Sequence, residues 1–251
     1  MTLLNFADEQ PSEFCSVLLY GPSGVGKSVA AASAPDPIIY CNADGPGALR
    51  YARRHHKGKQ IMEVPVAGRA PIDALIVELR NGDWDDVKTV ALDSLGRIYD
   101  VLLAELAGPN NKPSLPQRGD VNTMMERCIL SLLELPVNLV LVAHDNPVVV
   151  TGKEEDGTAE VELFPHTGTN NPGLAKKIMR PLDIVAFCGR RMVGEGEEKH
   201  EEFLAQTYNA GGRHGKDRTD VVGANARLDL TEWFERIHAA YPTQTPQEVA
   251  A

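Results

Sequence analysis

The chain has 251 residues, a length that favours one domain with a sizeable hydrophobic core. Acidic residues outnumber basic ones by 35 to 25, and the formal net charge of −10 argues against a protein that coats nucleic acid through bulk charge. The four cysteines stand far apart without a C-x-x-C pair, which argues against a zinc site and a disulfide framework.

The first residues, 1–13, are predicted to be a lead-in of low structural content. They lack a basic start followed by a long apolar core, and no run elsewhere approaches the ~18 apolar residues of a membrane span. We therefore expect a cytoplasmic protein with reduced thiols and no membrane contact. One domain is expected over residues 14–240, followed by a flexible polar tail over 241–251.

A phosphate-binding loop of the form G-x-x-x-x-G-K-S follows the apolar run 16–20 and precedes the apolar run 29–32, which predicts strand, loop and helix. The loop consists of Gly21, Pro22, Ser23, Gly24, Val25, Gly26, Lys27 and Ser28. Its glycines let successive N–H groups point at one phosphate, and the helix start adds positive charge. Lys27 is predicted to reach the β- and γ-phosphates and Ser28 to ligate magnesium. A turn that binds nothing is the alternative.

A second buried strand is predicted over residues 37–44, and it ends in Asp44. Ligands of open α/β sheets collect at the carboxyl ends of strands, so Asp44 is a candidate for polarising the attacking water. An ordinary turn aspartate is an equal alternative, because Asp-Gly is a common turn pair. The basic stretch 50–59 is interpreted as a solvated helix face, with a contact to a phosphate backbone or to a neighbouring subunit as the alternative. Residues 60–66 are predicted to form a strand and residues 71–81 a helix.

A third strand, 87–93, ends in Asp93. A carboxylate beside the phosphate loop is suited to holding magnesium, usually through water, so Asp93 is predicted in that role. The helix 95–107 then gives way to a polar Pro/Gly segment, 108–119, which we expect to be mobile. This segment carries Lys112 and Arg118, both candidates for contact with nucleic acid.

Asp120 is expected to cap a helix over 121–135, and a buried strand over 137–145 carries His144 near its end. His144 is a candidate sensor of the γ-phosphate or an ordinary structural histidine. The pattern from 148 to 164 predicts a hairpin whose tip carries Lys153, a third candidate for nucleic-acid contact.

Two antiparallel strands, 183–192 and 202–208, are predicted to extend the sheet before a closing helix over 229–237. Between them and that helix, Lys216 and Arg218 stand two residues apart. They would point to the same side of an extended segment and offer two cations to a phosphate. A basic loop without a ligand is the alternative.

Residues 14–238 resemble the RecA/RadA-like recombinase ATPase core. The resemblance rests on the phosphate loop, the acids after the second and third strands, the polar residue after the fourth strand and the late K-x-R pair. The resemblance is closest to small phage-type nucleotide-binding proteins, including single-strand annealing recombinases. It implies an α/β fold, a mostly parallel sheet with helices on both faces and an antiparallel C-terminal extension. It also implies that the chain hydrolyses ATP with Mg²⁺.

The same resemblance implies specific roles. Asp44 occupies the position of the catalytic glutamate, His144 that of the γ-phosphate sensor, and Lys216 and Arg218 those of fingers that reach the ATP of a neighbouring subunit. It further implies self-assembly into a ring or filament and binding of single-stranded DNA, although Phe164 is the one obvious aromatic residue in the two corresponding loops. A nucleotide-switched binding module with little turnover and a P-loop kinase of a small substrate remain alternatives.

Overall fold

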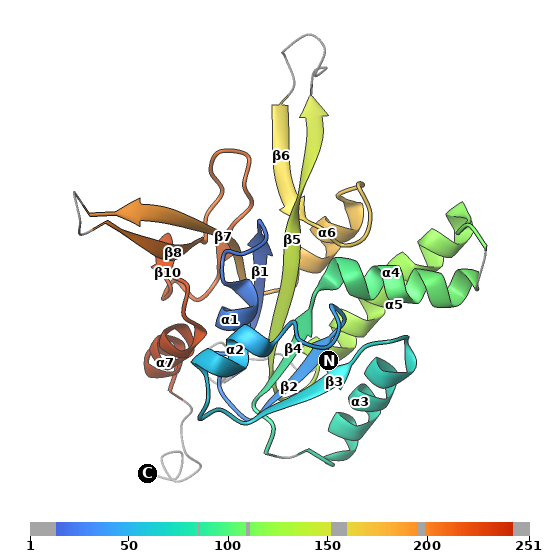
Figure 1. Ribbon diagram of the computed structural model, residues 1–251, viewed down its shortest axis with the longest axis horizontal. Helices are drawn as coiled ribbons and strands as arrows, with labels where there is room; N and C mark the ends of the chain where they lie inside the picture. Colours follow the sequence, from blue (N-terminus) through green and yellow to red (C-terminus); the bar gives the residue numbers. More distant parts are fainter. Residues whose placement is uncertain (1–13, 85, 109–110, 152–159, 195–198, 243–251) are drawn as a thin grey trace, which may run out of the picture.

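The computed structural model describes residues 14–84, 86–108, 111–151, 160–194 and 199–242 (Figure 1). The strands are β1 (Ser16–Gly21), β2 (Ile38–Asn42), β3 (Ile61–Pro65), β4 (Thr89–Asp93), β5 (Asn138–Thr151), β6 (Glu160–Pro165), β7 (Ile184–Val193), β8 (His200–Gln206), β9 (Lys216–Asp217) and β10 (Asn225–Arg227). The helices are α1 (Lys27–Ala31), α2 (Arg50–His55), α3 (Ala70–Asn81), α4 (Leu95–Ala107), α5 (Leu115–Leu133), α6 (Gly173–Met179) and α7 (Leu230–Ala240).

The strands form one sheet in the order β10-β8-β7-β1-β5-β4-β2-β3, with β6 paired to β5 and β9 to β7. The strands from β7 to β3 along this order run parallel. The strands β6, β8, β9 and β10 are antiparallel to their partners. This arrangement confirms the predicted fold class, a mostly parallel sheet with an antiparallel extension on its C-terminal side.

Helices cover both faces of the sheet because the parallel strands are apolar on both sides. Leu18 and Tyr20 of β1 pack in the core beneath α3, α4, α5 and α6, whereas Val17 and Leu19 pack in the core beneath α1, α2 and α7. All four side chains are fully buried. Among the described helices, none is long and apolar enough to cross a membrane.

The helix α5 begins earlier than the sequence indicated. It starts at Leu115, so Arg118 and Gly119 lie in its first turns and not in a mobile segment. Ser114 caps it: the Ser114 hydroxyl accepts from the Gln117 N–H, and the Gln117 side chain accepts from the Ser114 N–H at 2.8 Å. The prediction that Asp120 caps this helix is therefore wrong, because a complete capping box six residues upstream already satisfies the helix start.

The predicted hairpin is present, but its first arm is continuous with the preceding strand. β5 runs without a break from the sheet into the projecting ribbon that it forms with β6 (Figure 1). The base of the ribbon is tied to the core at Tyr20. The Tyr20 hydroxyl lies 3.2 Å from the Leu163 carbonyl oxygen of β6, and it also donates to the carbonyl and accepts from the N–H of His214, in the neighbouring loop, both at 2.7 Å. The adjacent Leu163 N–H donates to the Gly212 carbonyl at 2.6 Å.

The early start of α5 makes Gly119→Ala a stabilising substitution. Gly119 lies within the helix, and a Cβ placed there would meet nothing within 4 Å. Alanine in a helix interior is favoured over glycine by about 0.5–1 kcal/mol, so the free energy of unfolding should rise by that amount in urea titrations. Gly108→Ala is the opposing control, because Gly108 ends α4 with a φ of 76° and should lose stability. A loss of stability in Gly119→Ala would contradict the helical assignment.

Candidate nucleotide-binding site

The candidate site lies at the edge of the sheet where β1, β2 and β4 end. The parallel register pairs Gly21 with His144, and Asp93 with both Asn42 and Val142. The phosphate loop, the Asp93 carboxylate and the His144 side chain therefore come to one edge from separate parts of the sequence. This convergence was predicted from the positions of these residues at strand ends.

The phosphate loop requires glycine where the backbone enters the left-handed region. Gly24 and Gly26 have φ angles of 79° and 83°, which β-carbon-bearing residues rarely adopt. Gly21 is restricted for a second reason, because a Cβ there would lie 2.3 Å from the Cys188 carbonyl oxygen of β7. The loop thus packs closely against the sheet and turns into α1 at Lys27.

Lys27 is buried, and its ammonium group turns back onto the loop. Its Nζ donates to the carbonyl oxygens of Gly21 at 2.8 Å and Pro22 at 2.6 Å. Burial lowers the pKa of Lys27, whereas nearby acidic groups, among them Asp93, raise it. Backbone carbonyls therefore satisfy the ammonium group, and a phosphate would exchange with them as its partner.

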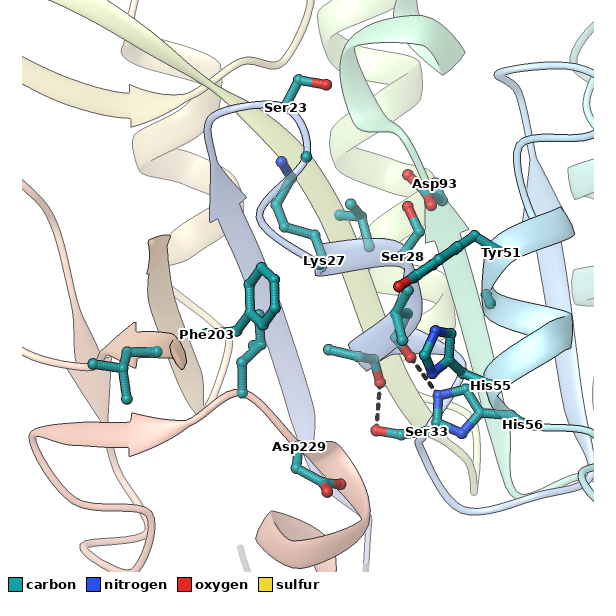
Figure 2. A pocket seen from close by; sticks show the side chains of 18 of the residues that line it. Ser23, Lys27, Ser28, Ser33, Tyr51, His55, His56, Asp93, Phe203 and Asp229 are labelled. Carbon is teal, nitrogen blue, oxygen red and sulfur yellow. Dashed lines mark hydrogen bonds between the residues drawn. The ribbon is translucent and has the colours of Figure 1, made fainter. Parts of the chain in front are cut away.

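Asp93 is 4% exposed and lies beside Ser28 and Tyr40. The Tyr40 hydroxyl donates to Asp93 Oδ2 at 2.5 Å. Burial raises the pKa of Asp93, and hydrogen bonds from Ser28 and Tyr40 act in the opposite direction. Figure 2 shows the Ser28 and Asp93 oxygens facing the same space, so the two predicted magnesium ligands are brought together.

Asp44 and His144 line the same cavity as the phosphate loop. Asp44 is exposed, and its Oδ1 accepts from the Ser94 hydroxyl at 3.2 Å. His144 is also exposed and lies within β5, not at a strand end as the sequence indicated. Both residues therefore border the space next to the phosphate loop.

The cavity has a volume of 1060 Å³ and extends along α1 well beyond the phosphate loop. One wall comes from α2, where the rings of Tyr51 and His55 are in contact, with centroids 4.4 Å apart and planes tilted by 49°. The other comes from β8 and the segment before α7, with Phe203 and Asp229. Figure 2 shows Phe203 and Tyr51 on opposite sides of α1. Tyr51 and His55 belong to the basic stretch 50–59, which the sequence did not link to the phosphate loop. Phe203 and Asp229 were not identified as site residues, because no motif connects them to the loop.

Lys216 and Arg218 lie at the opposite end of the sheet. Lys216 pairs with Val185 near the start of β7. Its Nζ donates to the Met179 and Arg180 carbonyls at 2.8 and 3.1 Å, and the Arg218 guanidinium donates to the Arg180 carbonyl at 2.7 Å. Both cations thus point to one side, as predicted, where they cap the C-terminal end of α6. Neither occurs among the described residues that line the cavity.

Two of the three candidates for nucleic-acid contact lie in the described part of the chain, both near the start of α5. Lys112 is exposed just before α5, and Arg118 is exposed within it. Lys153 lies outside the described residues. Phe164 is fully buried, stacked on His214 with ring centroids 4.2 Å apart and covered by Lys176. The expectation that Phe164 is available for stacking on bases is therefore wrong.

The strand order, the glycine-rich loop and the paired Ser28 and Asp93 define a P-loop nucleoside-triphosphatase fold with a RecA-like core. Residues 13–219 match the AAA domain family, and the chain belongs to this family. No curated protein sequence matches it. A solved KaiC-like protein from the hyperthermophilic archaeon Pyrococcus horikoshii OT3 is similar at a TM-score of 0.44 and 16% identity, covering 79% of this chain and 81% of that one.

The residues of the site fit a nucleoside triphosphate with magnesium, as membership of this family implies. The left-handed glycines leave backbone N–H groups without side chains in front of them, and Lys27 supplies a buried cation. Ser28 and Asp93 supply a hydroxyl and a carboxylate, oxygen ligands of the kind that magnesium prefers.

The burial of Asp93 predicts that Asp93→Asn stabilises the protein in the absence of nucleotide. Because the pKa of Asp93 is raised on folding, the folded state binds protons more readily, and the free energy of unfolding falls as pH rises through the carboxyl range. Asparagine removes the buried charge. Urea unfolding in EDTA should therefore show Asp93→Asn above the wild type at pH 7, with the gap narrowing toward pH 4.

Asp83→Asn, at an exposed position, is the control and should leave stability nearly unchanged. Equal stabilities of Asp93→Asn and the wild type at pH 7 would contradict the predicted cost of burying this carboxylate.

Proposed function

We propose that the chain is a magnesium-dependent ATPase of the phage-type RecA-like kind, which assembles with copies of itself and binds single-stranded DNA in recombination or annealing. The observation that carries the ATPase part is the convergence of Lys27, Ser28 and Asp93 at one edge of the sheet beside a cavity of 1060 Å³. Membership of the AAA domain family supports it.

The phosphates of ATP are assigned to the loop end of the cavity. The N–H groups around Gly24 and Gly26 would hold the phosphate oxygens, and Lys27 would exchange its two carbonyl partners for the β- and γ-phosphates. Ser28 would ligate magnesium directly, and Asp93 would hold it through water. When bound, magnesium neutralises charge that develops on the phosphates.

The nucleoside is assigned to the part of the cavity that runs along α1. Phe203, 39% exposed, offers an apolar ring there, and its side chain lies against Gly26. Tyr51 and His55 form the facing wall. An aromatic wall on either side of α1 gives a flat base a surface to pack on, whereas phosphate contacts alone would not distinguish a nucleotide from inorganic triphosphate.

Hydrolysis would proceed by in-line attack of water on the γ-phosphorus. A new bond forms from the water oxygen to that phosphorus, and the bond from the phosphorus to the β–γ bridging oxygen breaks. The products are ADP and phosphate, and the proton lost by the water passes to solvent. Asp44, held by the Ser94 hydroxyl, is the residue that would orient the water, and His144 would contact the γ-phosphate. Lys27 stabilises the charge that develops on the leaving oxygens.

Self-assembly with ATP between subunits is supported by the position of Lys216 and Arg218. Both cations lie at the end of the sheet away from their own phosphate loop. In the proposed assembly they would therefore contact the ATP of a neighbouring copy, in the head-to-tail arrangement that generates rings or filaments. Their present partners, the carbonyls at the end of α6, would be exchanged on assembly.

Binding of single-stranded DNA is supported by exposed cations outside the nucleotide cavity. Lys112 and Arg118 lie at the start of α5, and Lys176 and Lys177 lie on α6. The described part of the ribbon carries Glu160 on β6, which repels a phosphate backbone. We therefore assign the DNA contact to the α5 and α6 side and not to the arms of the ribbon.

The first test is ATP turnover by the purified protein with magnesium, with and without single-stranded DNA. We expect turnover that DNA stimulates, and a loss of about 100-fold or more in Lys27→Ala, because the main cation at the phosphates is removed. Lys57→Ala, an exposed lysine just after α2, is the matched control and should retain turnover. ATP hydrolysis that is indifferent to DNA would remove the recombination role, and no binding of ATP would remove the proposed function altogether.

The second test is subunit mixing. Lys27→Ala and Arg218→Ala should each be inactive alone, but an equal mixture should recover about a quarter of wild-type turnover, because one interface in four joins an intact loop to an intact finger. The measurement is turnover across mixing ratios at constant total protein. Absence of recovery at every ratio would show that Arg218 acts within its own chain, as a cap of α6.

A further inference from the structure

A buried tyrosine contacts the carboxylate of Asp93, the predicted magnesium ligand. Tyr40 lies in the middle of β2 with no exposed surface. Its hydroxyl donates to Asp93 Oδ2 at 2.5 Å, a short bond of the charge-assisted kind. Ser28, the other predicted magnesium ligand, lies beside the same carboxylate.

The parallel register explains why Tyr40 reaches this position. Tyr40 is paired with Ala91 of β4, and Asp93 follows two residues later on the same face of the sheet. Diagonal neighbours of this kind are separated by about 7–8 Å, a distance that an aromatic side chain spans. Tyr40 packs in the core beneath α1, the helix that carries Ser28.

We propose that Tyr40 is a positioning residue for the magnesium site, which holds the Asp93 carboxylate in one orientation beside Ser28. The inference rests on the proposed function, because the cation would bind together with the phosphates of ATP. With Oδ2 occupied by Tyr40, Oδ1 is the oxygen left to face the cation and its water. Hydrogen-bond partners behind a metal ligand fix its orientation in this way.

A purely structural role for Tyr40 makes a different prediction. A buried tyrosine hydroxyl needs a partner, and Asp93 would then serve the core with no consequence for the cation. Tyr40→Phe separates the two roles because it removes the hydroxyl and keeps the ring. Tyr99→Phe is the matched control: Tyr99 is equally buried, and its hydroxyl donates to the Arg118 carbonyl at 3.4 Å, on the other face of the sheet.

The experiment measures cation affinity directly. Protein saturated with ATP at low temperature is titrated with Mn²⁺, and free Mn²⁺ is followed by electron paramagnetic resonance, while binding of a fluorescent ATP analogue in EDTA reports nucleotide affinity without the cation. Tyr40→Phe should weaken Mn²⁺ binding about 10- to 100-fold and leave the affinity in EDTA unchanged, whereas Tyr99→Phe should change neither. Circular dichroism verifies that both variants are folded.

A second comparison tests whether Tyr40 acts through Asp93. In an Asp93→Asn background, Tyr40→Phe should have little further effect on Mn²⁺ affinity, because the carboxylate it positions is gone. Unchanged Mn²⁺ affinity in Tyr40→Phe, or an equal loss of affinity with EDTA and with Mn²⁺, would overturn the inference while the proposed function stands. A wild type that binds no ATP would overturn the proposed function itself, and the inference with it.

Discussion

The parallel hydrogen-bond ladder that joins β1, β5, β4 and β2 is the constraint on which the site depends. It places the end of β1, the Asp93 carboxylate and the His144 side chain at one edge, although they are separated by up to 123 positions in the chain. A shift of one residue in any pair would turn alternate side chains to the opposite face. Because helices bury both faces, such a shift would also expose apolar side chains, so the register that stabilises the core also positions the site.

The strands, the phosphate loop and the position of Asp93 at the end of a strand were predictable because their signals are local: apolar runs, fixed spacing and an acid at a strand end. The start of α5 was missed because Pro113, Pro116 and Gly119 suggested a loop, whereas Pro near a helix start is favourable. Tyr40 and Phe203 were missed for another reason. Their relation to the site comes from tertiary packing between distant segments, which leaves no pattern in the sequence around either residue.

Two charged groups of the site are buried at a cost to stability. Lys27 and Asp93 lose their hydrogen bonds with water on folding. Hydrogen bonds with the loop carbonyls, for Lys27, and with Tyr40, for Asp93, replace part of them. Hydrogen bonds that are already formed hold the side chains of a binding site in fixed orientations. The same hydrogen bonds must be broken or shared when phosphate and a cation bind. The affinity for nucleotide therefore depends on the difference in free energy between the hydrogen bonds within the empty site and the bonds made with the nucleotide and cation.

Tyr20 occupies the position directly before the phosphate loop, and its hydroxyl is bonded to the chain at the base of the ribbon. The Tyr20 ring is fully buried, and His214 in turn hydrogen-bonds with Glu162 of β6. The strand β5 makes a second connection, because it carries His144 at the cavity and continues into the ribbon. The end of β1 and the base of the ribbon are therefore joined both by side-chain hydrogen bonds and by a continuous strand.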